Sequence, residues 1–239
     1  MAVPAGIYFD ASKLSPSPEY VCWIDVMGSE SIMLRSLKTA SNFVMKLHIA
    51  ALTACEEIEV DVFPVIDGMY VCSPSQRSIL DFIDSVYSQL ADVFVNETEP
   101  YKTFVIRGGL AYGPIVKGSQ AFECNEKLAD CKDYTRRILV GPALTQAFRI
   151  EEKSSPFGLV IHESVRTFAP EGTNTLSMTF WKWWISDRAN GNNKARQVYE
   201  HLNQYFDWCL KHTVELSYPE DKIKKHRELS KEYFSEFNE

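Results

Sequence analysis

Strand-like and helix-like segments alternate along the first two thirds of the chain in a specific order. Segments rich in β-branched and aromatic residues predict strands, and segments whose apolar residues recur every three or four positions predict helices. The predicted strands lie at 19–27, 58–66, 69–73, 103–112 and 158–162, and the predicted helices at 29–55, 75–96 and 143–152. This order is typical of an α+β fold built on a ferredoxin-like split βαβ sheet, here with an extension.

Small and capping residues mark the turns between the first elements. Gly28 ends the first strand, and Ser29 or Ser31 can cap a helix that we expect to run unbroken for about seven turns. The dipeptide Asp67-Gly68 suits the positive φ of a tight hairpin turn. Residues 119–136 are polar and lack periodicity, so an irregular excursion is predicted there.

The last sixty residues differ in character from the rest. We predict an aromatic strand at 180–185, whose tryptophans pack between the sheet and two helices at 194–216 and 219–237. The last helix is charged on most faces, which favours a solvated or packing role. The expected organisation is an N-terminal extension at 1–18, one globular domain at 19–190, and a C-terminal helical extension at 191–239 packed on the same domain.

The composition excludes several classes of partner. A chain of 239 residues with 45% hydrophobic residues can bury a core, and a net charge of -7 argues against a general nucleic-acid or anionic-membrane surface. No signal peptide or membrane-spanning stretch is evident, and the six cysteines form no CxxC pair. We therefore expect a soluble, cytoplasmic protein with no nucleic-acid and no membrane partner.

Two aspartates stand at the ends of neighbouring predicted strands. Asp25 closes an apolar run at 20–24, and Asp67 closes another at 62–66. An aspartate at a strand end is often structural, because its side chain hydrogen-bonds to the backbone of the turn. Two carboxylates delivered together also form a site of hard oxygen ligands, which suits Mg²⁺ or Mn²⁺ and the phosphates that these ions hold.

Four segments, taken in order, resemble the class III nucleotidyl cyclase homology domain. The family pattern has an aspartate after the first strand, a second aspartate on the following hairpin, an Arg-x-Gly strand and a Gly-x-x-x-Asn-x-x-x-Arg helix. The matching segments lie within residues 19–165 and are Trp23–Gly28, Val65–Tyr70, Arg107–Gly113 and Gly141–Arg149. Each motif is weak alone, but four in this order with fitting gaps are fairly specific.

The resemblance implies a site for metal ions and phosphates. Asp25, Asp67 and the backbone carbonyl of Val26 would bind two Mg²⁺ or Mn²⁺ ions, and the turn at Gly28 and Ser29 would cradle the β- and γ-phosphates. The implied reaction is attack of a ribose 3′-hydroxyl on the α-phosphorus of a nucleoside triphosphate, with pyrophosphate leaving.

Two residues of the predicted helix at 143–152 complete the implied catalytic set. Arg149 stands where the family places the arginine that stabilises the transition state, and Thr145 stands where an asparagine usually holds the ribose. By the same resemblance, Asp25 and Asp67 of one chain would face Thr145 and Arg149 of a second chain. The resemblance therefore implies a homodimer with two composite active sites.

The positions that select the base depart from the purine cyclases of this family. Phe63 and Ile138 stand where those enzymes carry polar residues. An apolar pair narrows the pocket and suits a smaller ring stacked on Phe63. The candidates for polar contacts to the base are Arg107, Tyr70, Arg136 and Arg137. Arg107 can equally be a structural arginine of its strand.

These features resemble the pyrimidine cyclases of bacterial Pycsar antiphage systems, whose cyclic UMP or cyclic CMP activates a separate effector. UTP is favoured over CTP as the substrate. Two alternatives stay open. One is an adenylate or guanylate cyclase that contacts its purine through other residues, and the other is a cyclase-like module without catalysis that binds a nucleotide or a partner.

Overall fold

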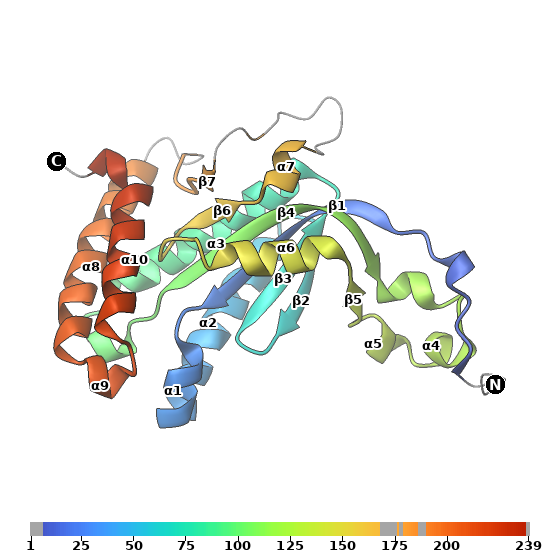
Figure 1. The fold of residues 1–239 in the computed structure, drawn as a ribbon, viewed down its shortest axis with the longest axis horizontal. Coiled ribbons are helices and arrows are strands. Elements are labelled where there is room, and N and C mark those ends of the chain that lie inside the picture. Colours follow the sequence, from blue (N-terminus) through green and yellow to red (C-terminus); the bar gives the residue numbers. More distant parts are fainter. Residues whose placement is uncertain (1–6, 168–175, 177–178, 186–189, 238–239) are drawn as a thin grey trace.

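A mixed sheet runs through the middle of the molecule in the computed structural model, which describes residues 7–167, 176, 179–185 and 190–237 (Figure 1). Its strands are β1 (Ser17–Val26), β2 (Asp61–Val65), β3 (Gly68–Ser73), β4 (Ile106–Lys117), β5 (Leu139–Val140), β6 (Leu159–Ile161) and β7 (Phe180–Trp181). Within the described residues the strands lie in the order β2-β3-β1-β4-β6-β7, with β5 beside β4. The part β2-β3-β1-β4 is the predicted ferredoxin-like split βαβ sheet.

The central strand β1 separates two hydrophobic cores. Tyr20 and Ile24 belong to the larger core, while Val21 and Trp23 belong to a smaller core on the other face. Side chains of a strand alternate between faces, so a strand in this position must be apolar on both. Asp25 follows directly and stands where the buried run ends.

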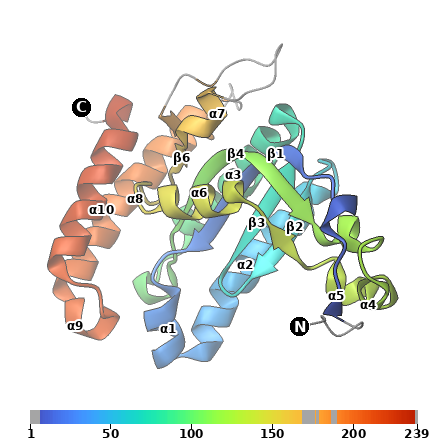
Figure 2. The same cartoon turned by 45° about the vertical axis from the view of Figure 1, so that its right-hand side comes forward.

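Helices cover the two faces of the sheet unequally (Figure 1, Figure 2). α2 (Leu37–Cys55) and α3 (Gln76–Asn96) lie against the larger core, and α6 (Pro142–Glu151) crosses the opposite face. α6 approaches β4 closely at Gly109, where an added Cβ would overlap the carbonyl oxygen of Ala147. Only a glycine lets the helix lie this near the strand.

The helix predicted to run unbroken over 29–55 is two helices. α1 spans Ser29–Arg35, and α2 begins after Ser36. Ser36 has an extended backbone, and its hydroxyl accepts a hydrogen bond from the Thr39 amide at 3.2 Å. This cap satisfies a free amide at the start of α2, so the chain can change direction there. The prediction was wrong because the apolar spacing continues across the break.

The β2-β3 hairpin turns one residue earlier than predicted. Val65 pairs with Gly68, so the loop consists of Ile66 and Asp67, and the positive φ of 47° falls on Ile66. Gly68 is required for space instead, because an added Cβ would lie 2.9 Å from the Trp23 ring. Asp67 still occupies the hairpin tip.

Several short elements differ in extent from the prediction. β2 begins at Asp61 rather than at 58, and β4 continues to Lys117 rather than ending at 112. The segment 119–136 contains short helices instead of an irregular excursion, since local caps such as the Asn125 side chain stabilise them. Further short helical elements before the C-terminal layer are η2 (Ala11–Lys13), η3 (Pro100–Lys102), η4 (Gly118–Ala121), α4 (Glu126–Asp130), α5 (Lys132–Thr135) and α7 (Glu163–Thr167).

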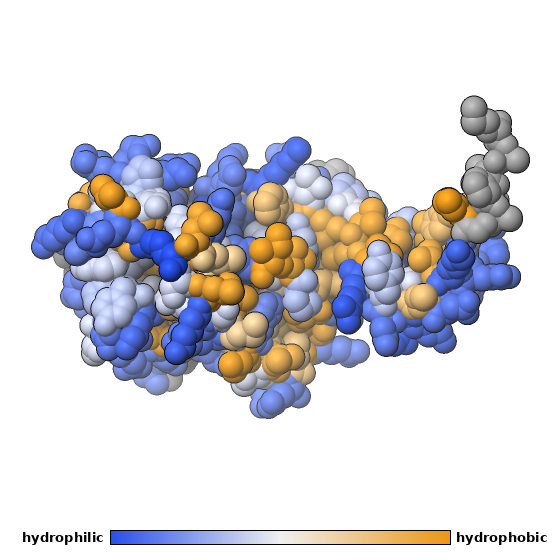
Figure 3. Space-filling model, turned by 90° about the horizontal axis from the view of Figure 1, so that it is seen from below, coloured by the Kyte–Doolittle hydropathy of each residue, from blue (hydrophilic) through white to orange (hydrophobic). Residues whose placement is uncertain are grey.

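Apolar side chains are exposed on the side of the molecule that carries α1 and the hairpin tip. Viewed from below, hydrophobic residues gather in the middle of the surface (Figure 3). Leu34 of α1 is 85% exposed and Ile66 of the hairpin is 86% exposed. On another part of the surface, Phe148 of α6 and Val140 of β5 are also exposed.

The C-terminal helices form a layer beside α3. They are α8 (Gly191–Lys211), α9 (Thr213–Leu216) and α10 (Glu220–Tyr233), followed by η5 (Ser235–Phe237). The two helices predicted here are each interrupted, at His212 and at Phe234, where the backbone leaves helical angles. Within the described residues, none of the helices combines the length and the apolar character that a membrane span requires.

The predicted aromatic strand at 180–185 pairs only at Phe180–Trp181, and Trp183 and Trp184 are buried. The Trp183 indole donates a hydrogen bond to the Phe157 carbonyl at 2.9 Å. Trp184 stacks on Phe234 with ring centroids 5.2 Å apart. The tryptophans therefore pack between the sheet and the C-terminal helices, as predicted.

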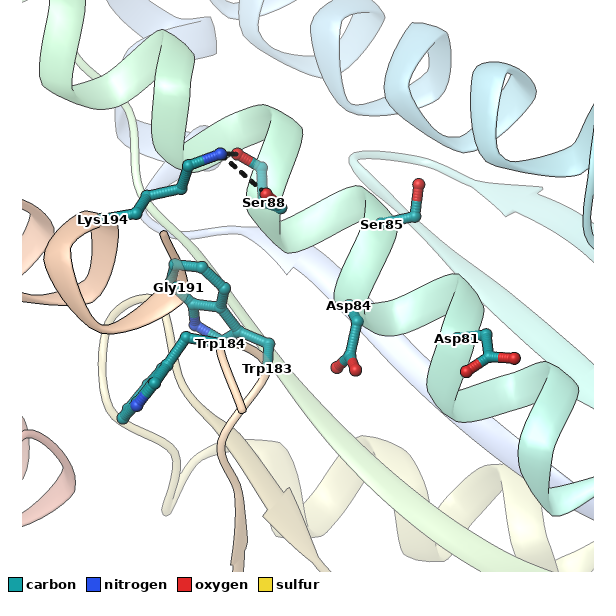
Figure 4. A pocket seen from close by; sticks show the side chains of 8 residues that line it. All are labelled: Asp81, Asp84, Ser85, Ser88, Trp183, Trp184, Gly191 and Lys194. Carbon is teal, nitrogen blue, oxygen red and sulfur yellow. Dashed lines mark hydrogen bonds between the residues drawn. The ribbon is translucent and has the colours of Figure 1, made fainter. Parts of the chain in front are cut away.

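A small cavity of about 260 Å³ lies where α3 meets α8 (Figure 4). Lys194 of α8 reaches across to α3, where it donates to the Ser88 hydroxyl at 2.8 Å and pairs with Asp92 at 2.8 Å. Lys194 is therefore already neutralised by α3. We interpret its contacts as packing interactions between the C-terminal helices and α3, and not as part of a ligand site.

Candidate active site

Asp25 and Asp67 meet at one end of the sheet. Asp25 lies near the end of β1, Asp67 lies at the hairpin tip, and the Val26 amide donates to the Asp67 carbonyl at 3.4 Å. These residues line one cavity of about 540 Å³, which we call the carboxylate cavity, together with Gly28 and Ser29. The structure therefore brings together the predicted metal ligands and the predicted phosphate-binding turn.

The Asp25 carboxyl group is largely buried, with 17% of its side chain exposed. Burial raises its pKa to about 6, while the Arg107 charge opposes this rise and the Asp67 carboxylate adds to it. Its Oδ1 has no hydrogen-bond partner in the described part of the chain. A buried carboxylate oxygen without a donor is stabilised by a nearby cation, so this environment suits a metal ion.

Asp67 is oriented by the turn that starts α1. The hydroxyl of Ser29, which is 4% exposed, donates a hydrogen bond to Asp67 Oδ2. The residue at the N-cap of α1 is Gly28, with a φ of 71°, rather than Ser29 or Ser31 as predicted. This conformation favours glycine and leaves the Ser29 side chain free to hold the carboxylate.

The donor set suits an ion that is shared with a substrate. Among the described residues, no group of three or more histidine, cysteine, aspartate or glutamate side chains could hold a metal ion. Mg²⁺ commonly takes one or two protein carboxylates and completes its coordination with phosphates and water. Asp25, Asp67 and the Val26 carbonyl match this requirement.

Arg107 lies in the carboxylate cavity, away from the other residues predicted to contact the base. Its guanidinium forms an ion pair with Glu151 at the end of α6, and its Nε lies 3.8 Å from Asp25 Oδ1. Glu151 is only 3% exposed and the Arg107 side chain is 19% exposed, so the pair is largely shielded from solvent. This placement favours the structural alternative for Arg107.

A second cavity, of about 920 Å³, lies between the β2-β3 hairpin and the segment from α5 to β5, and we call it the hairpin cavity. Four of the residues predicted to contact the base line it, namely Phe63, Tyr70, Arg136 and Arg137. Leu139 lines it as well, whereas Ile138 does not. Neighbouring residues of an extended segment face opposite sides. The apolar side chain of this segment that lines the cavity is therefore that of Leu139, one residue after the predicted Ile138.

Thr145 and Arg149 lie on the outer side of α6. Their spacing of four residues places them on one face of the helix, and both are exposed. The opposite face, which carries Ala143 and Ala147, is buried against the sheet. Neither Thr145 nor Arg149 lines the carboxylate cavity of its own chain.

Comparison with known proteins supports this architecture. No protein-family model matches the sequence, and no curated protein matches it. Among solved structures, a bacterial light-regulated adenylyl cyclase matches with a TM-score of 0.50 at 12% identity, over 66% of this chain and 46% of that chain. The chain has the fold of a class III nucleotidyl cyclase domain.

Two further solved structures match the chain less well. The adenylate/guanylate cyclase/hydrolase from Silicibacter pomeroyi matches with a TM-score of 0.48 at 14% identity, over 70% of this chain and 93% of that chain. The guanylyl cyclase domain of the RhoGC fusion protein from the aquatic fungus Blastocladiella emersonii matches with a TM-score of 0.46 at 19% identity, over 62% of this chain and 82% of that chain.

In this cyclase fold the C-terminal layer contributes to the carboxylate cavity, which the sequence interpretation missed. Tyr218, Lys222, Lys225 and His226 all line it. The Tyr218 hydroxyl and His226 Nδ1 are hydrogen-bonded at 2.5 Å. Burial, followed by the positive charges of Arg107, Lys225 and Lys222, lowers the pKa of His226 to about 4.

One sequence signal could have identified the contribution of α10. Lys224 has an acidic partner four positions away, Glu220, and the two form an ion pair at 2.6 Å. Lys222 has no acidic residue three or four positions away on either side. A lysine without such a partner is a better candidate for an external anion than for a solvated helix surface.

Proposed function

We propose that this chain is a nucleotidyl cyclase that converts UTP to 3′,5′-cyclic UMP and pyrophosphate. The observation that carries the proposal is the Asp25 carboxylate, which is buried beside Asp67 in a cavity with one oxygen that no described protein donor satisfies. A purely structural buried aspartate normally has such a donor. A metal-bound triphosphate accounts for the missing interaction.

Two Mg²⁺ or Mn²⁺ ions, when bound, would activate the ribose 3′-hydroxyl and neutralise charge on the triphosphate. The residues of the chain prepare this site. Ser29 fixes the orientation of Asp67. Glu151 holds the Arg107 guanidinium, so that Arg107 does not neutralise Asp25 completely.

We place the base in the hairpin cavity, whose lining combines apolar side chains with a few polar donors. Phe63 offers a ring on which a base can stack, and Leu139 and Leu144 add apolar wall. Tyr70 and Arg137 supply hydrogen-bond donors at the same cavity. Arginine donors suit uracil, which has two carbonyl acceptors, better than cytosine, whose amino group is a donor that arginine cannot accept from.

We propose that two copies of the chain form composite active sites. Arg149 and the hairpin cavity of one chain would face the carboxylate cavity of its partner. Exposed apolar residues occur on both of the surfaces that would meet. Ile66 of the hairpin tip and Leu34 of α1 lie on one surface, and Phe148 of α6 and Val140 of β5 lie on the other. A self-complementary interface would bury both sets.

The product would serve as a second messenger. By similarity to the pyrimidine cyclases of Pycsar systems, cyclic UMP made in the cytoplasm would activate a separate effector during antiphage defence. The cellular test is to measure cyclic UMP after phage infection of cells that express wild-type protein or the Asp67→Asn variant. We expect a rise only with the wild type.

The biochemical test is incubation of the purified protein with each of the four nucleoside triphosphates and Mn²⁺. We expect UTP to be converted fastest, and Asp67→Asn to abolish the conversion. Asp81→Asn is the matched control, because Asp81 is an exposed aspartate of α3 that pairs with Arg77.

The alternatives predict different results of this assay. Conversion of ATP or GTP above that of UTP and CTP would replace the pyrimidine proposal with a purine cyclase. If the folded wild-type protein converts none of the four nucleotides, the chain is better described as a cyclase-like binding module.

A further inference from the structure

The carboxylate cavity has two walls that come from distant parts of the sequence. One wall consists of the ends of β1 and β4, the hairpin tip and α1, and the other consists of residues of α8, α9 and α10. Figure 2 shows α9 and α10 on the same side of the molecule as α1. The walls touch directly, because the Arg35 guanidinium of α1 donates to the backbone carbonyl of Glu215 in α9.

The positive charges that line this cavity are not equally available to a ligand. Arg107 is held by Glu151, and Arg35 donates to the backbone carbonyls of Ser31 and Glu215. The other lysine and arginine side chains that line the cavity are those of Lys222 and Lys225. Neither forms an ion pair or a hydrogen bond within the described part of the chain, and both are exposed.

Helix geometry separates these lysines from their neighbours. Lys222 and Lys225 are three residues apart and therefore lie on one side of α10. Lys224 does not line the cavity and is neutralised by Glu220. α10 thus contributes two unpaired cations to the lining of the carboxylate cavity, whereas its paired lysine lies outside that lining.

α10 is held firmly enough to position these charges. Ile223, between the two lysines, is fully buried in the larger core. Arg227, one turn further on, pairs with Asp207 of α8 at 2.5 Å and donates to the Asn203 carbonyl at 3.2 Å. The lysine ammonium groups are therefore carried by an anchored helix rather than by a loose terminus.

We propose that Lys222 and Lys225 bind the terminal phosphates of the triphosphate whose metal ions Asp25 and Asp67 of the same chain hold, an inference that rests on the proposed nucleotidyl cyclase function. Two carboxylates suit metal ions but repel phosphate oxygens, so a cavity for a metal-bound polyphosphate needs additional positive charge. The lysines provide this charge from outside residues 19–165, which carry the family resemblance.

The neutral pair of Tyr218 and His226 lies beside these lysines in the same wall. Both side chains can donate or accept hydrogen bonds without adding charge. They give the cavity a polar surface that tolerates both the triphosphate and the departing pyrophosphate.

The test measures binding of inorganic tripolyphosphate in the presence of Mg²⁺ by isothermal titration calorimetry, which requires no turnover. We expect the double variant Lys222→Ala/Lys225→Ala to bind at least about tenfold more weakly than wild type, because each lysine can form charge-assisted hydrogen bonds to phosphate. Lys224→Ala is the matched control on the same helix and should bind like wild type. Thermal unfolding of all three proteins checks that they are folded.

Other outcomes would overturn the inference. It fails if wild type does not bind tripolyphosphate, if the double variant binds as tightly as wild type, or if Lys224→Ala loses as much affinity as the double variant. The lysine proposal and the proposed cyclase function can fail independently of each other. A protein that cyclises UTP with an unchanged KM in the double variant refutes only the lysine site, whereas a protein without cyclase activity that still loses tripolyphosphate affinity refutes only the cyclase.

Discussion

The Arg107 Nε lies 3.8 Å from Asp25 Oδ1, and the positive charge of Arg107 offsets only part of the rise that burial causes in the pKa of Asp25. Glu151 holds Arg107 in an ion pair that is largely shielded from solvent, and the pKa of Asp25 stays raised at about 6. One oxygen of this carboxylate therefore has no hydrogen-bond donor in the described part of the chain, at the position where we propose that a metal ion binds. Glu151 does not line the cavity itself, but we expect its ion pair with Arg107 to keep that guanidinium from pairing more closely with Asp25.

Glu151→Gln is expected to weaken metal binding. Without its partner, Arg107 would pair with Asp25 and compete with the metal ion, which should lower Mn²⁺ affinity about tenfold, the effect of one charged hydrogen bond. Calorimetric titration with Mn²⁺ measures this. Glu126→Gln is a control on an exposed glutamate of α4, and an affinity for Mn²⁺ equal to wild type in Glu151→Gln would contradict the role of Glu151.

Two inactive variants should restore activity when they are combined in one dimer. Asp67→Asn removes a proposed metal ligand and Arg149→Ala removes the arginine that we propose stabilises the transition state, so each homodimer should lose about a hundredfold or more in rate. A mixed dimer, purified with two different affinity tags, regains one intact site of two and about half of the wild-type activity. Activity no higher than that of either variant alone would show that the active sites are not shared between chains.

Leu139→Ala should change base selectivity more than Ile138→Ala. Leu139 lines the hairpin cavity, and its truncation widens the space for a purine. Ile138 instead accepts a backbone hydrogen bond from Gly118 at 2.8 Å. We expect the ratio of ATP to UTP conversion to rise about tenfold in Leu139→Ala and to stay within about twofold in Ile138→Ala. A larger change in this ratio for Ile138→Ala than for Leu139→Ala would show that Ile138 selects the base, as the sequence analysis predicted.

Acid should destabilise the protein partly through His226. The pKa of His226 is about 4 in the folded protein, compared with 6.5 for an ordinary histidine, since burial and then Arg107, Lys225 and Lys222 disfavour its charged form. The stability that this neutral histidine contributes is present above pH 6.5 and is lost as pH falls towards 4. At about 1.4 kcal/mol for each pKa unit, the loss amounts to about 3 kcal/mol.

The measurement for His226 is urea unfolding at several pH values between 7.5 and 4. The difference in unfolding free energy between wild type and His226→Gln should shrink or reverse as pH falls, because glutamine does not titrate. The comparison with the variant is needed since Asp25, whose pKa is raised, contributes in the opposite direction over the same range. A difference that does not change with pH would contradict the prediction.

The sheet could be predicted from the sequence because β1 is apolar on both faces. The two aspartates could be predicted to lie at strand ends because each ends an apolar segment. Features that depend on a single residue were not recovered. Ser36 breaks a helix whose apolar spacing continues, and the two residues of β5 carry too little pattern to set its register. In the sequence, Lys222 and Lys225 resemble a solvated helix surface, and only the fold shows that they line the same cavity as the two aspartates.

The close approach of α6 to β4 limits how far this cyclase fold can vary in sequence. At Gly109, any side chain would overlap the Ala147 carbonyl, and α6 is the helix that carries Thr145 and Arg149. A chain that keeps this helix in place must keep glycine at this position, even when the residues that contact the base have diverged. Together with the two aspartates, Gly109 should therefore help to find distant relatives that overall identity does not reveal.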